Sequence, residues 1–358
     1  MRFSSTDIIS DISNVCFVKH LVVFMCLYYH SRVIKSSHIG VIIMKFTVGL
    51  AATDTKFVNC ILENKEHIYE VYFSWGDFAN GRNAQSASAE FAPWEIADIQ
   101  RSNLKKLSEN GIALNMLFNA NCYGSNSQSR AFFDKIGTAV DYVAVNYGLA
   151  SVTTTSPLIS KFIKNNFDRL DVRASVNMEI GTVQGMRYLE KYFDSYYIKR
   201  ELNRNISDIR VLHEWAATNG KKLFMLANSG CLNYCSAHIF HDNLVAHESE
   251  IAKMDNAYNF TGMCHEFLSD ESHYDSLIND TNFVLPEDIH LYEPYVEAAK
   301  LATRVHRHPE LVLRSYVRGK YSGDVLRLLE PEHSIYPYVV ENGKPLRLVR
   351  IDEKTLEY

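Results

Sequence analysis

The residues best suited to chemistry are thiols and imidazoles gathered in one stretch, from Leu223 to His247. A strand-like apolar run, Leu223 to Ala227, ends in Asn228-Ser229-Gly230, and the potential ligands follow directly. They are Cys231, Cys235, His238, His241 and His247, with Cys264 later in a second short loop. Thiolates and imidazoles bind zinc and iron, so the stretch predicts a metal centre or a thiol-based catalytic site.

Four kinds of site fit these residues. Cys231 and Cys235 are spaced C-x3-C and can face one centre, with Cys264 added from the second loop and Cys122 from the end of an earlier strand. Four thiolates from separate loops form the ligand set of an iron–sulfur cluster. Cysteines with His238 or His241 would bind zinc, although the spacing follows no standard zinc-finger pattern. A catalytic cysteine–histidine pair fits as a third kind, and buried free cysteines with no ligand fit as a fourth.

The composition is that of a globular protein with a large core: of 358 residues, 47% are hydrophobic and 22% are charged. The formal net charge of −5 argues against a broad nucleic-acid-binding surface but allows a local basic patch. Seven cysteines, an odd number, disfavour a complete disulfide framework, and clustered free thiols fit a reducing compartment. We therefore expect a cytoplasmic protein.

The first 43 residues differ from the rest. The run from Val15 to Tyr29 is apolar but is interrupted by Lys19 and His20, and a membrane span needs about 20 apolar residues. Met44 stands directly before a clean strand-like run. We expect residues 1–43 to be an extension outside the fold, with a membrane anchor as the alternative. The domain is then expected at 44–330, followed by a tail at 331–358.

Strand-like and helix-like runs alternate from Met44 onward. The expected helices are 94–110 (ending at Gly111), 155–166, 183–193 and 207–219, the last with Ser207 as N-cap and Gly220 as stop. The expected strands are 46–51, 69–75, 113–119, 142–146, 172–177, 196–199, 223–227 and 299–304. This alternation predicts an α/β fold, a TIM-type (β/α)8 barrel with an insertion after strand 7 and a short β-rich C-terminal tail. An open doubly wound sheet is the alternative, but no glycine-rich phosphate loop follows the first strand.

Asparagines end three neighbouring expected strands. Barrel enzymes carry their active sites at these carboxyl ends of the strands. The asparagines are Asn119, Asn146 and Asn177 on the third, fourth and fifth strands. Asparagine is also a common turn residue, because it tolerates a left-handed backbone, so each one alone fits a turn as well as a site.

Arginines gather near the ends of the later strands: Arg200 and Arg204 follow the sixth, and Arg304 ends the eighth. Guanidinium groups suit a carboxylate or a phosphate, although a surface ion pair is the plainer interpretation. We expect these three arginines to bind an anionic substrate. Glu201 and Asn228 are the expected catalytic residues that orient it.

Three stretches make the chain resemble a divergent branch of peptidase family U32, the collagenase-like proteins. They are Asn228-Ser229-Gly230-Cys231-Leu232 with Cys235 and His238, then Leu285–Ile289 leading through Tyr292 to Lys300–Arg304, and Tyr316 through Leu329. Gly81-Arg82 and Glu109–Ile112 fit as well. The resemblance covers most of 44–330 and implies a TIM-barrel-like domain.

The family is named for proteolysis, while better understood relatives bind a 4Fe-4S cluster through four cysteines and act in oxygen-independent hydroxylation of RNA or a quinone precursor. By this resemblance Cys231, Cys235 and Cys264 are cluster ligands, and Cys122 is added as the fourth from its place at a strand end. The leading hypothesis is a 4Fe-4S enzyme that hydroxylates an RNA or a small anionic molecule. The chain could instead be a peptidase that depends on zinc or a thiol, or a non-catalytic binding barrel with structural cysteines.

Overall fold

The computed structural model describes residues 44–81, 91–255, 258, 260, 262–273, 275–331, 340–341 and 344–345. The described residues all belong to one compact unit, 44–358. The N-terminal extension, Arg82 and most of the tail lie outside the described residues. In the part of the chain that the structure describes, no helix is long and apolar enough to cross a membrane.

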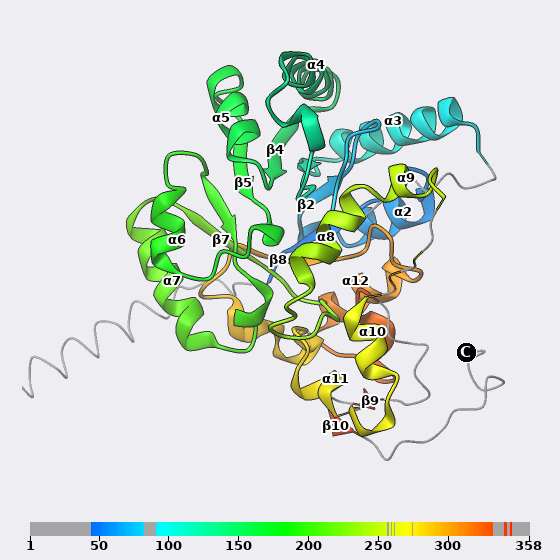
Figure 1. Ribbon diagram of the computed structural model, residues 1–358, viewed down its shortest axis with the longest axis vertical. Coiled ribbons are helices and arrows are strands. Elements are labelled where there is room, and N and C mark those ends of the chain that lie inside the picture. Colours follow the sequence, from blue (N-terminus) through cyan, green and yellow to red (C-terminus); the bar gives the residue numbers. More distant parts are fainter. Residues whose placement is uncertain are drawn as a thin grey trace, which may run out of the picture. The chain divides into compact units, whose positions relative to one another are not determined.

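Eight parallel strands close into a barrel, each paired with the next along the chain and the last with the first. This confirms the predicted TIM-type (β/α)8 fold (Figure 1). The strands are β1 (Phe46–Gly49), β2 (Ile68–Phe73), β3 (Leu114–Phe118), β4 (Leu149–Thr154), β5 (Asp171–Ala174), β6 (Ser195–Tyr197), β7 (Lys222–Leu226) and β8 (Ala298–Leu301). Closure brings residues about 250 positions apart into register, for example Phe46 opposite Ala299.

The prediction of the fourth strand is wrong. Residues 142–146 lie inside a helix, α4 (Arg130–Tyr147), and the strand begins two residues after it ends, at Leu149. The helix presents Val140, Val143 and Tyr147 to the core at spacings of three and four, which is the helical period. Asn146 therefore ends no strand, and its side chain caps its own helix by donating to the Tyr142 carbonyl at 2.7 Å.

Helices follow the strands on the outside of the barrel (Figure 1). They are α2 (Thr55–Glu63), α3 (Pro93–Glu109), α4, α5 (Pro157–Asn166), α6 (Val183–Tyr188), α7 (Ile206–Thr218) and α12 (Pro309–Arg318), with short 3-10 turns η2 (Lys65–His67), η3 (Gly124–Gln128), η4 (Val176–Met178), η5 (Arg200–Leu202) and η8 (Val325–Leu328). The four predicted helices exist, but α6 is shorter than expected. The N-cap of α7 is Asn205, whose side chain accepts from the Asp208 amide, so Ser207 lies within the helix.

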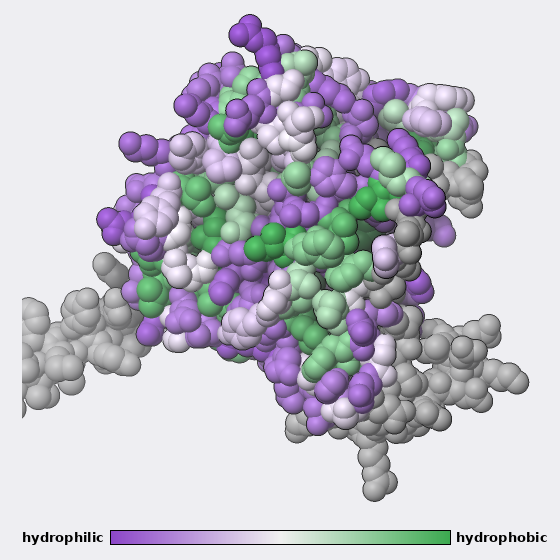
Figure 2. Space-filling view, viewed as in Figure 1, coloured by the Kyte–Doolittle hydropathy of each residue, from purple (hydrophilic) through white to green (hydrophobic). Residues whose placement is uncertain are grey.

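The predicted insertion lies between β7 and β8. It contains α8 (His238–Ala246), α9 (Glu248–Ile251), α10 (Met263–Leu268), η6 (Glu271–His273), α11 (Ser276–Asn279) and η7 (Pro286–Tyr292). Large apolar side chains are exposed on it, including Ile239, Phe240, Met263 and Phe267. Figure 2 shows the apolar band that crosses this face of the molecule. In the tail, β9 (Val340–Glu341) pairs antiparallel with β10 (Lys344–Pro345); the rest of the strands expected there lies outside the described residues.

The amino-terminal half of the barrel lumen holds a buried ionic network. Arg173 is fully buried, and its guanidinium contacts the carboxylates of Glu70 and, at 2.7 Å, Asp171. The cation lies 3.7 Å from the centre of the Phe224 ring. Burial opposes the charge of Arg173, but the neighbouring carboxylates outweigh it and raise its pKa overall. The buried cation in this half of the lumen is thus fully paired with carboxylates.

Candidate functional site

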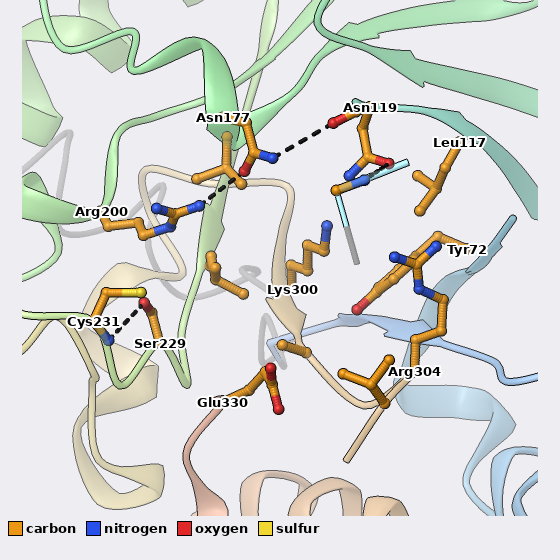
Figure 3. A pocket seen from close by; sticks show the side chains of 15 residues that line it. Tyr72, Leu117, Asn119, Asn177, Arg200, Ser229, Cys231, Lys300, Arg304 and Glu330 are labelled. Carbon is orange, nitrogen blue, oxygen red and sulfur yellow. Dashed lines mark hydrogen bonds between the residues drawn. The ribbon is translucent and has the colours of Figure 1, made fainter. Parts of the chain in front are cut away.

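A cavity of about 60 Å³ opens at the carboxyl ends of the strands. Figure 3 shows side chains from several strand ends converging on it. Its polar lining comes mainly from Tyr72, Asn119, Asn177, Arg200, Lys300, Arg304 and Glu330. The cavity therefore lies where TIM-type barrels carry their chemistry, because the βα-loops converge there.

Arg200 is held in place by a network of side chains. It is 5% exposed, it donates to Asn177 Oδ1 at 2.8 Å and contacts the His238 ring, and Glu179 Oε1 lies 3.8 Å away. Glu179 has a left-handed backbone, with φ of +54°, which costs energy for a residue with a side chain. That conformation places its carboxylate beside Arg200 and His238. We interpret the network as the device that fixes the guanidinium at the cavity wall.

Lys300, from β8, is the most perturbed group in the cavity. Its side chain is 7% exposed, and its ammonium lies 4.3 Å from the centre of the Tyr72 ring. Burial, with the charges of Arg304 and Arg200, lowers the pKa of Lys300 to about 7. Of the described residues that line the cavity, only Glu330 is acidic. The site therefore combines an excess of positive charge with an amine that can exchange a proton near neutral pH.

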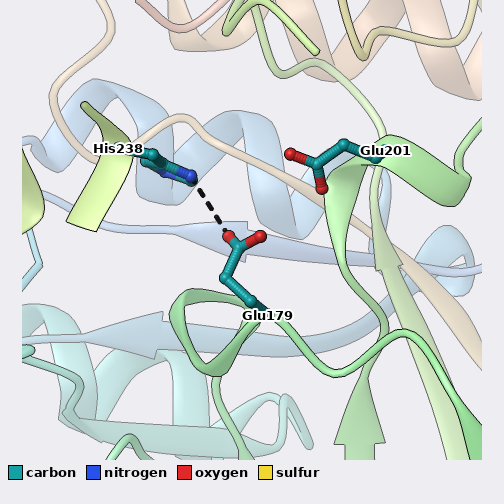
Figure 4. Close-up of side chains that lie close together, drawn as sticks. All are labelled: Glu179, Glu201 and His238. Atoms are coloured by element: carbon teal, nitrogen blue, oxygen red, sulfur yellow. Dashed lines mark ion pairs between the residues drawn. The ribbon is translucent and has the colours of Figure 1, made fainter. Parts of the chain in front are cut away.

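Glu179, Glu201 and His238 lie together beside this cavity, as Figure 4 shows. Among the described residues, they form the one set of three or more histidine, cysteine, aspartate or glutamate side chains whose potential ligand atoms all lie within 4.8 Å of one another. Burial opposes the ionisation of Glu179, but His238 and Arg200 outweigh it and lower its pKa. Because the Arg200 guanidinium already supplies a cation there, we interpret the set as an ion-pair network rather than as a metal site. Glu201 thus lies beside Glu179 and His238 and is not among the residues that line the cavity.

Three of the four predicted thiol ligands come together. Burial, together with the charges of Cys231 and Cys235, raises the pKa of Cys264 to about 11, so the three lie within electrostatic reach. The His241 ring lies next to Gly262, where an added Cβ would be 3.5 Å from its Cε1 atom and 3.7 Å from the sulfur of Cys264. Cys231 also lines the cavity. Thiols that oppose one another's ionisation favour a bound cation, since a metal stabilises the thiolates.

The three thiols offer sulfur ligands to either of the metals that the sequence predicts. Tetrahedral zinc binds sulfur at about 2.3 Å, so its ligand atoms lie close to one another. Among the described residues, no set that includes these cysteines has its ligand atoms within 4.8 Å. The donor set of three thiols with His241 nearby is therefore compatible with an iron–sulfur cluster, whose several iron atoms separate the sulfurs.

Cys122 lies apart from the other three thiols. It lines a different groove, together with His247 and Glu250. Its interaction with His247 lowers the pKa of its thiol. The structure thus does not bring the predicted fourth ligand to the other three.

Two other predicted residues face away from the cavity. The Arg204 guanidinium donates to the Phe283 carbonyl at 3.1 Å and lies 4.8 Å from the centre of the Phe283 ring. Burial lowers its pKa. Asn228 is fully buried, and its amide donates to the Leu328 carbonyl at 2.9 Å and accepts from the Ala302 amide at 2.7 Å. Both side chains therefore join the chain segments around the barrel mouth.

Lys300 is the functional residue that our sequence analysis missed. It stands in Ala298-Ala299-Lys300-Leu301, an otherwise apolar strand. A lysine in the middle of a short barrel strand is the signal that could have found it, because a charge there must lie in the lumen or in the layer between strands and helices. His238 was considered as a zinc ligand and as part of the stretch that resembles family U32, and the structure shows that it contacts Arg200 and Glu179.

The fold and the site define a TIM-barrel protein with a cationic cavity and a thiol cluster at its mouth. No protein-family model matches the chain. In sequence it is similar to the uncharacterized protease MJ1657 of Methanocaldococcus jannaschii, with 23% identity over 292 residues, covering 78% of this chain and 80% of the relative. In structure it is similar to the U32 peptidase Mk0906, with a TM-score of 0.52 and 13% identity, covering 72% of this chain and 91% of that one. Together these two matches confirm the resemblance to peptidase family U32.

Proposed function

We propose that the chain is an enzyme that modifies a small anionic group at the barrel mouth, next to an iron–sulfur cluster held by Cys231, Cys235 and Cys264. The observation that carries the proposal is the place of Cys231, which lines the cavity and belongs to the thiol set. A redox centre there would be adjacent to whatever Arg200 and Arg304 bind.

The residues of the cavity have complementary roles. Arg304 and Arg200 bind the anion, since guanidinium groups match carboxylate and phosphate oxygens. Lys300 gives or takes a proton, because a group with a pKa near 7 serves as both acid and base at neutral pH. Glu179 acts through His238 and Arg200 by keeping the guanidinium oriented, and Glu201 adds a second carboxylate within 4.8 Å of Glu179 and His238.

When bound, an iron–sulfur cluster supplies one-electron transfer. The reaction that fits such a centre best is the redox modification, by hydroxylation, of a small molecule or of an RNA group that carries a phosphate. The small cavity favours a small molecule, or one exposed nucleotide, over a broad nucleic-acid surface. The free thiols are those expected of a protein in the reducing cytoplasm.

The test is metal analysis of protein purified and reconstituted without oxygen. The wild-type protein should contain iron and sulfide and be brown, and Cys231→Ser should lose most of the iron. Cys122→Ser is the matched control, and it should keep its iron because Cys122 lies in another groove. Wild-type protein that stays colourless and free of iron after reconstitution would contradict the proposal.

Peptide hydrolysis at the mouth is the second candidate, because the two relatives are named as a protease and a peptidase. The specific observation in its favour is a thiol, Cys231, in the cavity wall beside Arg200. It predicts stoichiometric zinc on these cysteines, or peptide cleavage that alkylation of Cys231 abolishes. Cleavage that survives both chelation and alkylation would exclude it, and a barrel without either activity would leave the cysteines a structural role.

A further inference from the structure

A second groove, of about 730 Å³, lies away from the barrel-mouth cavity and is far larger. One wall is formed by the loop after β3 and by η3 and the start of α4, and the other by the end of α8 and by α9. Phe78 and Phe132 give it an apolar floor, packed edge to face with their ring centres 6.1 Å apart. The groove can therefore accept a ligand much larger than the mouth can.

A thiol, an imidazole and a carboxylate lie near one another on its wall: Cys122, His247 and Glu250. The Cys122 thiol and the His247 ring line the same groove and lie close enough to shift each other's pKa. The ring's Nδ1 lies 2.9 Å from Glu250 Oε2, which leaves Nε2 for the thiol. The Gly124 amide also donates to the Cys122 sulfur, at 3.3 Å. A nucleophile, a base and an orienting group are the parts that thiol-based catalysis requires, and this groove brings all three together.

The charges around these groups favour the ion pair of thiolate and imidazolium. Interactions with His247 and with the Gly124 amide lower the pKa of Cys122, while those with Cys122 and Glu250 raise the pKa of His247. The other charged groups that line the groove are Asp77, Lys135 and Lys253, of which the first two pair with each other at 2.6 Å. Both the thiol and the ring are partly exposed, so a substrate can reach them.

We propose that Cys122 and His247 are the catalytic residues of a second site that transfers acyl groups, with Glu250 as the positioning residue for the ring. The thiolate attacks the carbonyl carbon of an ester or amide and forms a carbon–sulfur bond. The carbonyl electron pair moves to oxygen and returns as the bond to the leaving group breaks. The imidazolium gives its proton to the departing alcohol or amine. Water, deprotonated by His247, then hydrolyses the thioester and restores the thiolate.

The lining of the groove defines the class of substrate. The two phenylalanine rings offer an apolar surface for a side chain, and the Lys135 ammonium, 5.1 Å from the centre of the Phe78 ring, lies above it. Asn80, Ser125 and Asn126 add polar groups along the walls. A peptide or an aminoacyl ester with an apolar side chain next to the scissile carbonyl matches this pattern. The assignment is independent of the iron–sulfur proposal, because the two sites share no residue.

The first test measures thiol reactivity on the reduced full-length protein. Iodoacetamide labelling, followed residue by residue with mass spectrometry, should modify Cys122 at pH 6 at least about tenfold faster than it modifies glutathione, since the ion pair keeps the thiolate at low pH. His247→Gln should remove this advantage. Glu250→Gln should move the pH profile of labelling upward, and Glu250→Asp should restore part of the shift. A Cys122 rate equal to that of glutathione, or one that His247→Gln leaves unchanged, would overturn the proposal.

The second test measures acyl transfer with p-nitrophenyl esters of N-blocked phenylalanine and alanine as probes. Wild-type protein should give a burst of about one nitrophenolate per chain, followed by slower turnover, with the phenylalanine ester preferred. Cys122→Ala should abolish the burst, whereas Cys60→Ala, a change at a buried thiol in α2, should keep it. Thermal unfolding of each variant verifies that it folds. An activated thiol without a burst, or a burst that survives Cys122→Ala, would overturn the acyl-transfer assignment.

Discussion

The barrel lumen has two halves that both contain buried charge, and they use it differently. In the amino-terminal half, Arg173 is paired with two carboxylates. At the mouth, Arg200, Lys300 and Arg304 line a cavity in which one described residue is acidic. The Tyr197 ring lies between the halves, 5.7 Å from the Arg173 guanidinium and 5.2 Å from the Lys300 ammonium, measured to the ring centre. A paired cation at one end stabilises the barrel, and the excess of positive charge at the other creates a place for an anion.

The largest loss of stability should come from breaking the ion pairs in the amino-terminal half of the lumen. Arg173→Met leaves the Glu70 and Asp171 carboxylates without their cation inside the barrel. Removing one partner of a buried pair costs about 3–5 kcal/mol, so the free energy of unfolding should fall by that amount in urea denaturation. Arg200→Met is the matched control at the mouth. It should cost no more than about 1 kcal/mol, because the partner Glu179 is partly exposed and keeps His238. Equal losses for the two variants would remove the distinction between the halves.

At the mouth, removing part of the excess positive charge should raise the free energy of unfolding rather than lower it. Lys300→Met should raise the free energy of unfolding at pH 6, where the wild-type protein still buries a charged amine. The folded pKa of about 7 is below the ordinary 10.5, so wild-type stability rises with pH between these values as the folded chain releases its proton first. The advantage of the variant should therefore shrink from pH 6 to pH 9, by about 1.4 kcal/mol for each unit above 7. The exposed Lys65→Met should show no such dependence, and a pH-independent difference for Lys300→Met would contradict the lowered pKa.

Anion binding should depend on the mouth alone. Arg304→Met should weaken the binding of inorganic phosphate, measured by calorimetry, by roughly tenfold to a hundredfold, as expected for a charged hydrogen bond worth about 1.5–3 kcal/mol. Arg318→Met, at the exposed end of α12, should leave phosphate affinity unchanged. If both variants bind equally well, the cationic lining does not form an anion site.

The architecture could be predicted because barrel strands and helices leave periodic patterns. The failure at the fourth strand shows the limit of this method. Residues 142–146 are rich in β-branched and aromatic side chains, but only Val143 of them is buried, on the same side of α4 as Val140 and Tyr147, whereas Tyr142 and Val145 are exposed. Tertiary packing at the helical period overrides the local preference for a strand. The true strand, Leu149–Thr154, was overlooked because its serine and threonines read as a loop.

The site could be predicted only where neighbours in space are also neighbours in sequence. The Cys231, Cys235 and Cys264 group was found because two of its members stand one turn apart. The sequence could not predict that Cys122 lies apart from this group, because the loop after β3 and the insertion come together only in the folded structure. Lys300 was missed for the same reason: its perturbed pKa comes from arginines on other segments of the mouth.

The smallest effect should come from Gly81, which supports the mouth without carrying charge. A Cβ at this position would lie 2.8 Å from the amide nitrogens of both Asn119 and Asn177. Since Asn177 accepts from Arg200 at 2.8 Å, Gly81→Ala should displace the guanidinium slightly and weaken phosphate binding a few-fold, with about 1 kcal/mol or less of lost stability. A double-mutant cycle with Asn177→Ala tests whether Gly81 acts on Arg200 through Asn177, because the effects of contacting residues are not additive. In the Asn177→Ala background most of the effect on phosphate affinity should vanish; if it persists in full, Gly81 does not act on Arg200 through Asn177.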